Sequence, residues 1–125
     1  MKILVVENFL PVSERLLSLL AQSGRYIGIA CVVSAALPEL IQIHQPAALL
    51  MDVRLDGGNG FELLMGLRSR GFTRPVIMLS ASNDAHYPLH AEAIGANAFL
   101  CKTSQFEKII PTLNRLLMIE IPPTP

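Results

Sequence analysis

Polar residues of four chemical kinds each follow a short apolar run of the sequence. They are the acid and amide pair Glu7 and Asn8, the acid Asp52, the hydroxyl residue Ser80 and the amine Lys102. In an open parallel sheet, ligands bind outside the carboxyl ends of the strands. If the four runs are parallel strands of one sheet, these side chains gather at a single edge of the molecule.

Such a set of side chains suits the transfer of a phosphoryl group. The carboxylate of Asp52 could attack phosphorus and form an aspartyl phosphate. Mg²⁺ prefers oxygen ligands and would offset the repulsion between that carboxylate and the incoming anion. Its candidate ligands are Glu7, Asn8, Asp52 and the backbone carbonyl of Arg54. Lys102 would donate hydrogen bonds to the phosphoryl oxygens, and the Ser80 hydroxyl could close on the same oxygens.

Each of these residues, taken alone, also has a structural explanation. Lys102 could be a solvated charge after an edge strand, Glu7 a surface carboxylate and Ser80 an ordinary residue at the end of a strand. Asp52 is different, because the three apolar residues before it belong to the run expected to be most buried. An unpaired carboxylate is costly in such a place, so a cation or a donor should meet it.

The elements that would position these residues follow a strand and helix rhythm repeated five times. The expected strands are the apolar runs at residues 3–6, 27–33, 47–51, 76–79 and 98–101. The alternation with helical stretches predicts a parallel sheet. Because the runs are almost continuously apolar, both faces of that sheet should be covered by helices.

Five stretches of helical period lie between and after the runs. The expected helices are residues 11–22, 38 to about 44, 60 to about 70, 88–95 and a last helix from residue 104. Ser104 and Glu107 form a capping-box pattern at the start of that last helix, and Pro111 inside it should kink it or expose its final turns. The Asn59-Gly60 pair is interpreted as the loop that enters the third helix rather than as a hairpin turn.

Composition limits the class of protein. The chain of 125 residues is 51% hydrophobic and 16% charged, which favours one well-packed domain. Ten basic and ten acidic residues are scattered along it, so we expect no direct contact with nucleic acid. Cys31 and Cys101 lie in apolar runs, and no apolar stretch approaches the roughly 20 residues of a membrane helix. We expect a cytoplasmic protein with reduced, buried thiols and no membrane contact.

Four segments resemble the signatures of response regulator receiver domains. They are KILVVEN (residues 2–8), LMDVRLDGGNG (50–60), VIMLSA (76–81) and GANAFLCK (95–102). The resemblance covers residues 1–118 and leaves residues 119–125 as a Pro-rich tail or the start of a linker. It implies a flavodoxin-like receiver fold, an α/β doubly wound five-stranded parallel sheet in the order 2-1-3-4-5 with helices on both faces.

The resemblance also implies a role for each candidate site residue. The family's residue that matches Asp52 accepts a phosphoryl group from a sensor histidine kinase or a phosphotransfer protein. The pair that matches Glu7 and Asn8 holds Mg²⁺, and the residues that match Ser80 and Lys102 contact the phosphate. Phe99 takes the position of the aromatic residue that turns inward when the hydroxyl residue moves, so Ser80 and Phe99 are the expected switch residues.

A receiver domain of this kind is a phosphorylation switch rather than an enzyme. At most it phosphorylates itself from phosphodonors and removes its own phosphate. The resemblance implies an output face made by the fourth helix, the fifth strand and the fifth helix, roughly residues 84–117. That face would contact an effector domain, a partner protein or a second copy of the chain.

Three positions depart from the family pattern. Asn8 stands where most receivers carry an acid, and a neutral amide should bind Mg²⁺ more weakly. Asp56 replaces a proline, which adds a carboxylate and should loosen the loop after Asp52. Thr103 replaces the proline after the lysine, whose peptide bond is normally cis, so the backbone at Lys102 should be held differently.

Two other functions are compatible with the same sheet. A pseudo-receiver would act as a protein-interaction module with weak or no Mg²⁺ binding and an output independent of phosphorylation, and Asn8 and Asp56 favour it. A flavodoxin-like enzyme or flavin carrier is disfavoured, because the segment from Asn8 to Pro11 lacks the small residues that would cradle a cofactor phosphate.

Overall fold

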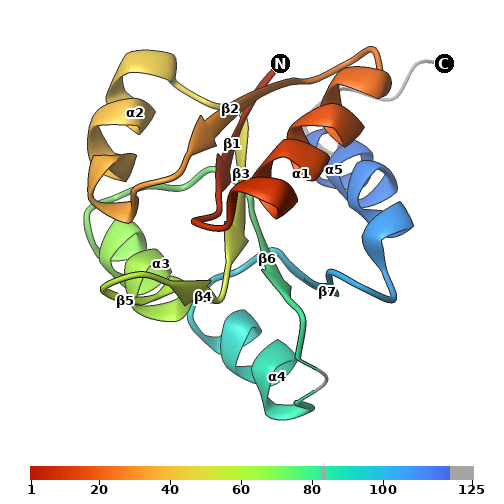
Figure 1. The fold of residues 1–125 in the computed structure, drawn as a ribbon. Helices are drawn as coiled ribbons and strands as arrows, with labels where there is room; N and C mark the ends of the chain where they lie inside the picture. Colours follow the sequence, from red (N-terminus) through yellow and green to blue (C-terminus); the bar gives the residue numbers. More distant parts are fainter. Residues whose placement is uncertain (83, 119–125) are drawn as a thin grey trace, which may run out of the picture.

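Five parallel strands form the central sheet of the protein, in the order β2-β1-β3-β6-β7 (Figure 1). The strands are β1 (Lys2–Val6), β2 (Ile27–Cys31), β3 (Ala48–Asp52), β6 (Val76–Ser80) and β7 (Ala98–Cys101). The computed structural model describes residues 1–82 and 84–118. Since β6 and β7 are the fourth and fifth expected strands, this arrangement confirms the order 2-1-3-4-5.

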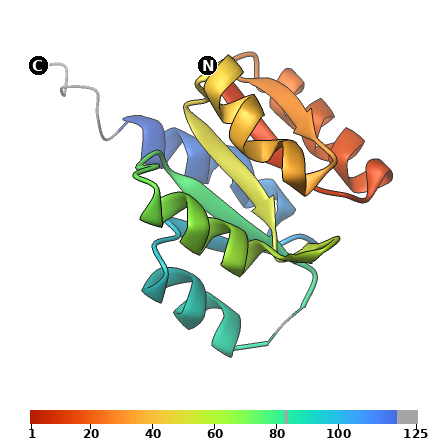
Figure 2. The ribbon, with the colours of Figure 1, turned by 90° about the vertical axis from the view of Figure 1, so that its left-hand side faces the viewer.

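Helices cover both faces of this sheet. They are α1 (Leu10–Gln22), α2 (Leu37–His44), α3 (Gly60–Ser69), α4 (His86–Ala93) and α5 (Ile109–Met118). Figures 1 and 2 show α1 and α5 on one face and α2 and α3 on the other. No helix in residues 1–82 and 84–118 is both long and apolar enough to cross a bilayer.

Alternate residues of each strand build the two cores. In β1, Ile3 and Val5 join the core under α1 and α5, whereas Leu4 and Val6 join the core under α2 and α3. All five residues of β3 are buried, so the sheet is covered on both sides along its central strand. This burial explains why the runs are apolar without interruption.

Prolines mark the starts of four of the helices. Pro11 and Pro38 are the second residues of α1 and α2, and Pro88 and Pro111 are the third residues of α4 and α5. The backbone N–H groups in the first turn of a helix have no intrahelical acceptor. Proline, which lacks a backbone N–H, is therefore tolerated there. These helices therefore begin one or two residues before their proline.

The prediction that the last helix begins at Ser104 is wrong. A 3-10 turn occupies Phe106–Lys108, and the α-helix α5 starts only at Ile109. An α-helix from residue 104 would place Pro111 in its interior, where it removes a hydrogen bond and clashes with the preceding turn. Because α5 starts at Ile109, Pro111 lies in its first turn, where a proline does not require the predicted kink.

The bounds of α4 and β2 also differ from the sequence prediction, and α4 spans His86–Ala93 instead of residues 88–95. Strand β2 ends at Cys31, two residues before the predicted end, because its one partner β1 ends at Val6 opposite Cys31. A 3-10 turn at Ser34–Ala36 then leads into α2. The predicted tail, residues 119–125, lies outside the described residues.

The loop after Asp52 contains a small hairpin that the sequence analysis did not predict. Strands β4 (Arg54–Leu55) and β5 (Gly58–Asn59) pair in antiparallel fashion around Asp56 and Gly57. Gly57 has φ of +79°, which a glycine adopts without strain. Asp56, which stands at the position of the family's proline, therefore lies in the turn of a paired segment.

Residues at the end of the hairpin fix the start of α3. The Asn59 side chain accepts a hydrogen bond from the backbone N–H of Glu62 at 2.9 Å, which makes Asn59 the N-cap of the helix. The Gly60 N–H donates to the carbonyl of Val53 at 2.7 Å. A Cβ atom at Gly60 would lie 2.1 Å from the backbone oxygen of Asp52, so only glycine allows this close approach.

Arg68 ties the end of α3 to the segment before β7. Its guanidinium group donates to the carbonyls of Gly95, Phe72 and Arg74 and to the side-chain oxygen of Asn97, at 2.8–3.1 Å. One side chain therefore satisfies acceptors from two loops at the amino ends of β6 and β7, the edge opposite Asp52.

Candidate functional site

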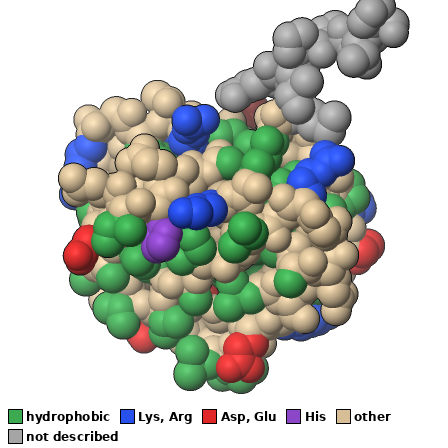
Figure 3. Space-filling view, turned by 90° about the horizontal axis from the view of Figure 1, so that it is seen from above, with side chains coloured by type: hydrophobic (Ala, Val, Ile, Leu, Met, Phe, Trp, Pro, Cys, Tyr) green, Lys and Arg blue, Asp and Glu red, His purple; other side chains and the backbone are tan. Residues whose placement is uncertain are grey.

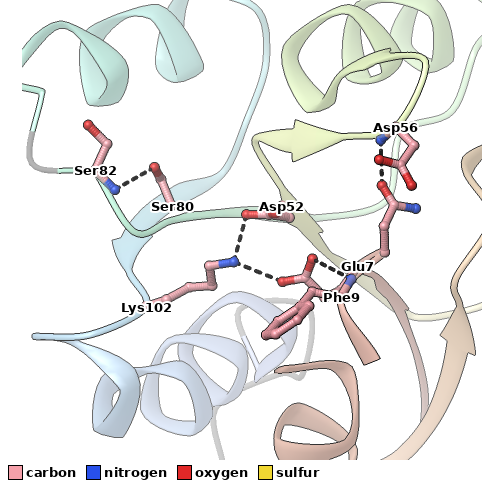
Figure 4. Close-up of polar contacts among 8 residues, drawn as sticks. Glu7, Phe9, Asp52, Asp56, Ser80, Ser82 and Lys102 are labelled. Carbon is pink, nitrogen blue, oxygen red and sulfur yellow. Dashed lines mark hydrogen bonds and ion pairs between the residues drawn. The ribbon is translucent and has the colours of Figure 1, made fainter. Parts of the chain in front are cut away.

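Glu7, Asp52 and Lys102 meet at the carboxyl edge of the sheet (Figure 4). The Lys102 ammonium lies 2.8 Å from a carboxylate oxygen of Glu7 and 3.0 Å from a carboxylate oxygen of Asp52. Asp52 is the last residue of β3, Glu7 follows β1, and Lys102 follows β7. Both acids are almost fully buried, with 2% of Glu7 and 6% of Asp52 exposed. The parallel topology thus converts three distant sequence positions into one ion-paired cluster.

The charges of the cluster shift the pKa values of its members. Burial raises the pKa of Asp52 from 3.8 to about 6; the Lys102 ammonium opposes this rise, and the Glu7 carboxylate adds to it. Burial alone would lower the pKa of Lys102, but its hydrogen bonds and charge pairing with Glu7 and Asp52 outweigh burial and raise it. Lys102 therefore stays charged, and Asp52 remains a carboxylate that its surroundings stabilise poorly.

Ser80 ends β6 beside the same cluster. Its hydroxyl oxygen accepts a hydrogen bond from the backbone N–H of Ser82 at 3.0 Å, and Figure 4 shows it turned toward that residue. A cavity of about 260 Å³ is lined by Asp52, Arg54, Ser80, Ala81, Ser82 and Lys102. Ser80 thus lies at the site while its hydroxyl is engaged within its own loop.

Asn8 lies at the site, but its side chain is engaged elsewhere. Its amide nitrogen donates to the carbonyl of Val32, and its amide oxygen accepts from the backbone N–H of Asp56 at 2.6 Å. These two bonds link the end of β2 to the β4–β5 hairpin. The Asn8 amide therefore connects two loops by hydrogen bonds.

A cavity of about 400 Å³ opens in front of the acids. It is lined by Glu7, Asn8, Phe9, Asp52, Arg54, Leu55, Asp56 and Lys102. In residues 1–82 and 84–118, no three His, Cys, Asp or Glu side chains lie close enough to form a metal cluster. Glu7 and Asp52 are the buried carboxylates of this cavity wall and pair with Lys102, whereas the third acid of the lining, Asp56, is exposed.

Two residues beside the candidate site, Phe9 and Ser82, were not singled out from the sequence. The backbone N–H of Phe9 donates to the second carboxylate oxygen of Glu7 at 3.4 Å, and the Phe9 ring is 63% exposed. Ser82, which holds the Ser80 hydroxyl, was missed as well. Backbone donors leave no mark on residue type, but both residues stand two positions after a predicted site residue, which is where a turn bond forms.

The backbone at Lys102 is held by the neighbouring strand rather than by a proline. The Lys102 N–H donates to the carbonyl of Ser80 at 2.8 Å, and the Gln105 side chain accepts from the N–H of Cys101 at 2.9 Å. No peptide bond in residues 1–82 and 84–118 is cis, Thr103 included. These bonds fix the direction in which the lysine leaves β7.

Phe99 is half-buried in β7 and packs against the core under α2 and α3. Its ring meets that of Tyr87 edge to face, with centroids 6.3 Å apart. Tyr87 in turn contacts Phe61 at 5.4 Å. The expected switch position thus belongs to an aromatic row that runs from β7 across α4 to α3.

Comparisons with known proteins agree with this geometry. A family model described as the response regulator receiver domain matches residues 3–114. The two-component response regulator PhoP of Pseudomonas aeruginosa is 31% identical over 117 residues, which cover 94% of this chain and 52% of PhoP. The chain thus spans about half the length of that relative.

Solved structures share the fold at low sequence identity. A two-component response regulator from Clostridium difficile has a TM-score of 0.87 and 18% identity over 98% of this chain and 99% of that one. The BeF3-activated N-terminal receiver domain of Klebsiella pneumoniae RstA has a TM-score of 0.86 and 21% identity over 94% of this chain and 98% of that one. With the family match over almost the whole sequence, these likenesses lead to one conclusion: the chain belongs to the response regulator receiver domain family of two-component signalling.

Proposed function

We propose that this receiver domain accepts a phosphoryl group on Asp52 from a sensor histidine kinase or a phosphotransfer protein. The observation that carries the proposal is the buried Asp52 carboxylate at the end of the central strand, 3.0 Å from an ammonium that also binds Glu7. Burial disfavours the charged form of this carboxyl group, and acids in such surroundings are concentrated at functional sites. Accepting a phosphoryl group is such a function.

The transfer is a substitution at phosphorus. A carboxylate oxygen of Asp52 forms a bond to phosphorus as the bond from phosphorus to the donor nitrogen of a phosphohistidine breaks, and that nitrogen keeps the electron pair. Lys102 neutralises charge on the phosphoryl oxygens, since its ammonium already lies within hydrogen-bond distance of the acceptor. The Ser80 hydroxyl, which lines the same cavity, would leave Ser82 to contact the new oxygens.

Mg²⁺ is the cofactor that this chemistry calls for, and the cavity residues fit it. Glu7 and Asp52 offer carboxylate oxygens, and Arg54 lines the same cavity and carries a backbone carbonyl. When bound, the ion supplies positive charge between the acceptor and the phosphoryl group. The Asn8 amide oxygen is neutral and already accepts a hydrogen bond from the Asp56 N–H, so we propose weaker Mg²⁺ binding than an acid at position 8 would give.

The output would be read through Ser80 and Phe99. Movement of the Ser80 hydroxyl changes the loop before α4, and the Phe99 ring contacts Tyr87 of α4. We propose that this rearrangement alters the face formed by α4, β7 and α5, where an effector domain, a partner protein or a second copy would bind. In this scheme residues 1–118 are the receiver and residues 119–125 a tail or linker.

We propose a cytoplasmic switch protein whose own chemistry is limited to self-phosphorylation from phosphodonors and loss of the phosphate. We propose no direct contact with nucleic acid by this chain. The net charge of zero supports this, as does the scatter of acidic and basic side chains on the described part of the face in Figure 3.

Phosphorylation from a small donor tests the proposal. The chain incubated with acetyl phosphate and Mg²⁺ should gain the mass of one phosphoryl group, and Asp52→Asn should gain none. Asp56→Asn is the matched control, because it removes an exposed acid from the same cavity and should still be labelled. Equal labelling of the Asp52→Asn variant would refute the assignment.

A pseudo-receiver remains the second candidate, and the engagement of both polar atoms of Asn8 favours it. Titration with Mg²⁺ while backbone amide shifts are recorded separates the two functions. Saturation at millimolar concentration, with shifts at Glu7 and around Asp52, supports the phosphorylated switch. No saturable shift supports the pseudo-receiver.

A further inference from the structure

A third cavity lies between the β4–β5 hairpin and α4, and neither Glu7 nor Asp52 is among its lining residues. Its volume is about 710 Å³, and its apolar wall is formed by Val53, Leu55, Phe61 and Tyr87. Figure 1 shows α4 below the hairpin and the start of α3. We call this cavity the hairpin groove. Its volume is in the range of pockets that hold small organic ligands.

The aromatic part of the groove wall consists of rings that pack against one another. Phe61 is only 8% exposed, and its ring meets Tyr87 edge to face at 5.4 Å and His90 at 4.6 Å. Contacts of this kind hold the rings in defined orientations. A flat aromatic ligand would therefore find preformed surfaces rather than mobile side chains.

Arg54 is the one permanently charged residue among those that line the groove in the described part of the chain. Arg54, His86 and His90 line it, and no acidic residue does so among the described residues. Arg54 is exposed, and no ion pair of its guanidinium group is present in residues 1–82 and 84–118. His86 is 3.0 Å from the Asp84 carboxylate, so Arg54 and His90 are the groups best placed to meet an added anion.

We propose that the hairpin groove binds a small aromatic carboxylate, with its ring against Phe61 and Tyr87 and its carboxylate at Arg54. Apolar walls with a few converging polar groups define such a site, and the Arg54 guanidinium, with no acid in the described lining, favours an anion over a neutral ligand. The site does not depend on phosphorylation of Asp52. Because Arg54 follows two residues after Asp52, a ligand here would adjoin the acceptor loop.

Amide shifts recorded during titration with 2-naphthoate test the site, without Mg²⁺ or a phosphodonor. Saturable shifts should gather at Val53, Arg54, Phe61, Tyr87 and His90. The neutral isostere 2-naphthalenemethanol should bind more weakly by about fivefold, the size expected for one partly exposed charge pair. Arg54→Gln should weaken naphthoate binding by a similar factor, and Arg74→Gln, which removes an exposed cation outside the groove, should not.

Three results would overturn the proposal. One is the absence of saturable shifts at the groove residues. Another is equal affinity for the acid and the alcohol together with no effect of Arg54→Gln, which would leave no preference for an anion. The third is displacement of naphthoate by an acidic peptide whose own shifts extend along the exposed face of α4 to Leu89, which would make the groove part of a protein interface.

Discussion

At the scale of single residues, Asp52 determines what the site can do. The residue is 6% exposed, and one ammonium lies 3.0 Å from its carboxylate. That ammonium is shared with Glu7, so the two buried acids have one cation between them. The site therefore holds an excess of negative charge, which a divalent cation would offset.

This excess charge predicts that Asp52→Asn stabilises the protein. Because the folded-state pKa of about 6 lies above the ordinary value of 3.8, the carboxyl group's contribution to stability is full below pH 3.8 and lost as pH rises through 6. Near pH 7.5 without Mg²⁺, the variant should raise the free energy of unfolding by about 1–3 kcal/mol. The gain should shrink as pH falls from 6 toward 3.8.

Urea unfolding at both ends of that pH range measures the effect. The exposed acid Asp56 provides the control, since Asp56→Asn should change stability by less than about 0.5 kcal/mol. A variant at position 52 that is less stable than the parent near neutral pH would show that Lys102 compensates the buried charge.

The affinity for Mg²⁺ should depend on the side chain at position 8. Asn8→Asp keeps an oxygen for the Asp56 N–H and adds a carboxylate to the cavity wall, so Mg²⁺ affinity should rise by about tenfold. The lost donation to the Val32 carbonyl should cost about 1 kcal/mol of stability. Amide shifts during a Mg²⁺ titration give the affinity.

Gln22→Glu is the charge-matched control for Asn8→Asp, because it adds the same charge at the exposed last residue of α1. It should leave the Mg²⁺ affinity unchanged within about twofold. If both variants bind Mg²⁺ equally well, position 8 has no part in the metal site.

The residue types at the site could be identified from the sequence, whereas their contacts could not. Glu7, Asp52 and Lys102 were found because each ends an apolar run, and the structure brings them together. The engagement of Asn8 with Val32 and of Ser80 with Ser82 depends on backbone groups of other segments. Residue types carry no information about such partners before the fold is known.

At the scale of elements, long periodic segments were predictable and short ones were not. Every expected strand and helix is present. The strands have apolar runs and most helices an amphipathic period, whereas α4 has no marked apolar face and was predicted from Pro88 and Gly95. The β4–β5 hairpin has two residues per strand, too few for any period. The feature of the sequence that indicates this hairpin is the Asp56-Gly57 dipeptide, a pair that favours tight turns between strands.

The start of α5 shows how one residue overrides a capping pattern. Ser104 and Glu107 have the spacing of a capping box, but the N-terminal residue before the 3-10 turn is Gln105 and no side-chain cap bond forms there. Pro111 excludes an α-helix that would contain it beyond the first turn. Proline position was therefore the better guide to where this helix begins.

Alanine substitutions at two glycines of α3 should have opposite effects on stability. Gly60→Ala would put a Cβ atom 2.1 Å from the Asp52 backbone oxygen and 2.9 Å from Met78, so β3 or the hairpin must shift. We expect a loss of at least about 2 kcal/mol in the free energy of unfolding. Gly66→Ala meets nothing closer than Arg70 at 3.9 Å and should gain about 0.5–1 kcal/mol.

Urea unfolding of the two variants side by side separates a steric effect from helix propensity. If Gly60→Ala is as stable as Gly66→Ala, the close approach between α3 and β3 does not constrain the acceptor strand.

At the scale of the whole molecule, strand order is what creates the site. β1, β3 and β7 lie in one parallel sheet with β6 between the last two, so their carboxyl ends share an edge. Glu7, Asp52 and Lys102 are therefore neighbours although 95 residues separate the first from the last. The βα rhythm predicted a parallel sheet, but the order of its strands was implied by family resemblance rather than by the rhythm.

The central claim is that Asp52 itself becomes the phosphorylated residue. Borohydride reduces an acyl phosphate to an alcohol, so an aspartyl phosphate formed from acetyl phosphate and Mg²⁺ would be converted to homoserine. Peptide sequencing by mass spectrometry after this treatment locates the converted residue. We predict homoserine at position 52 and at no other acid; conversion at Glu7 or Asp56, or at no position in a chain that carries the added phosphoryl mass, would contradict the account.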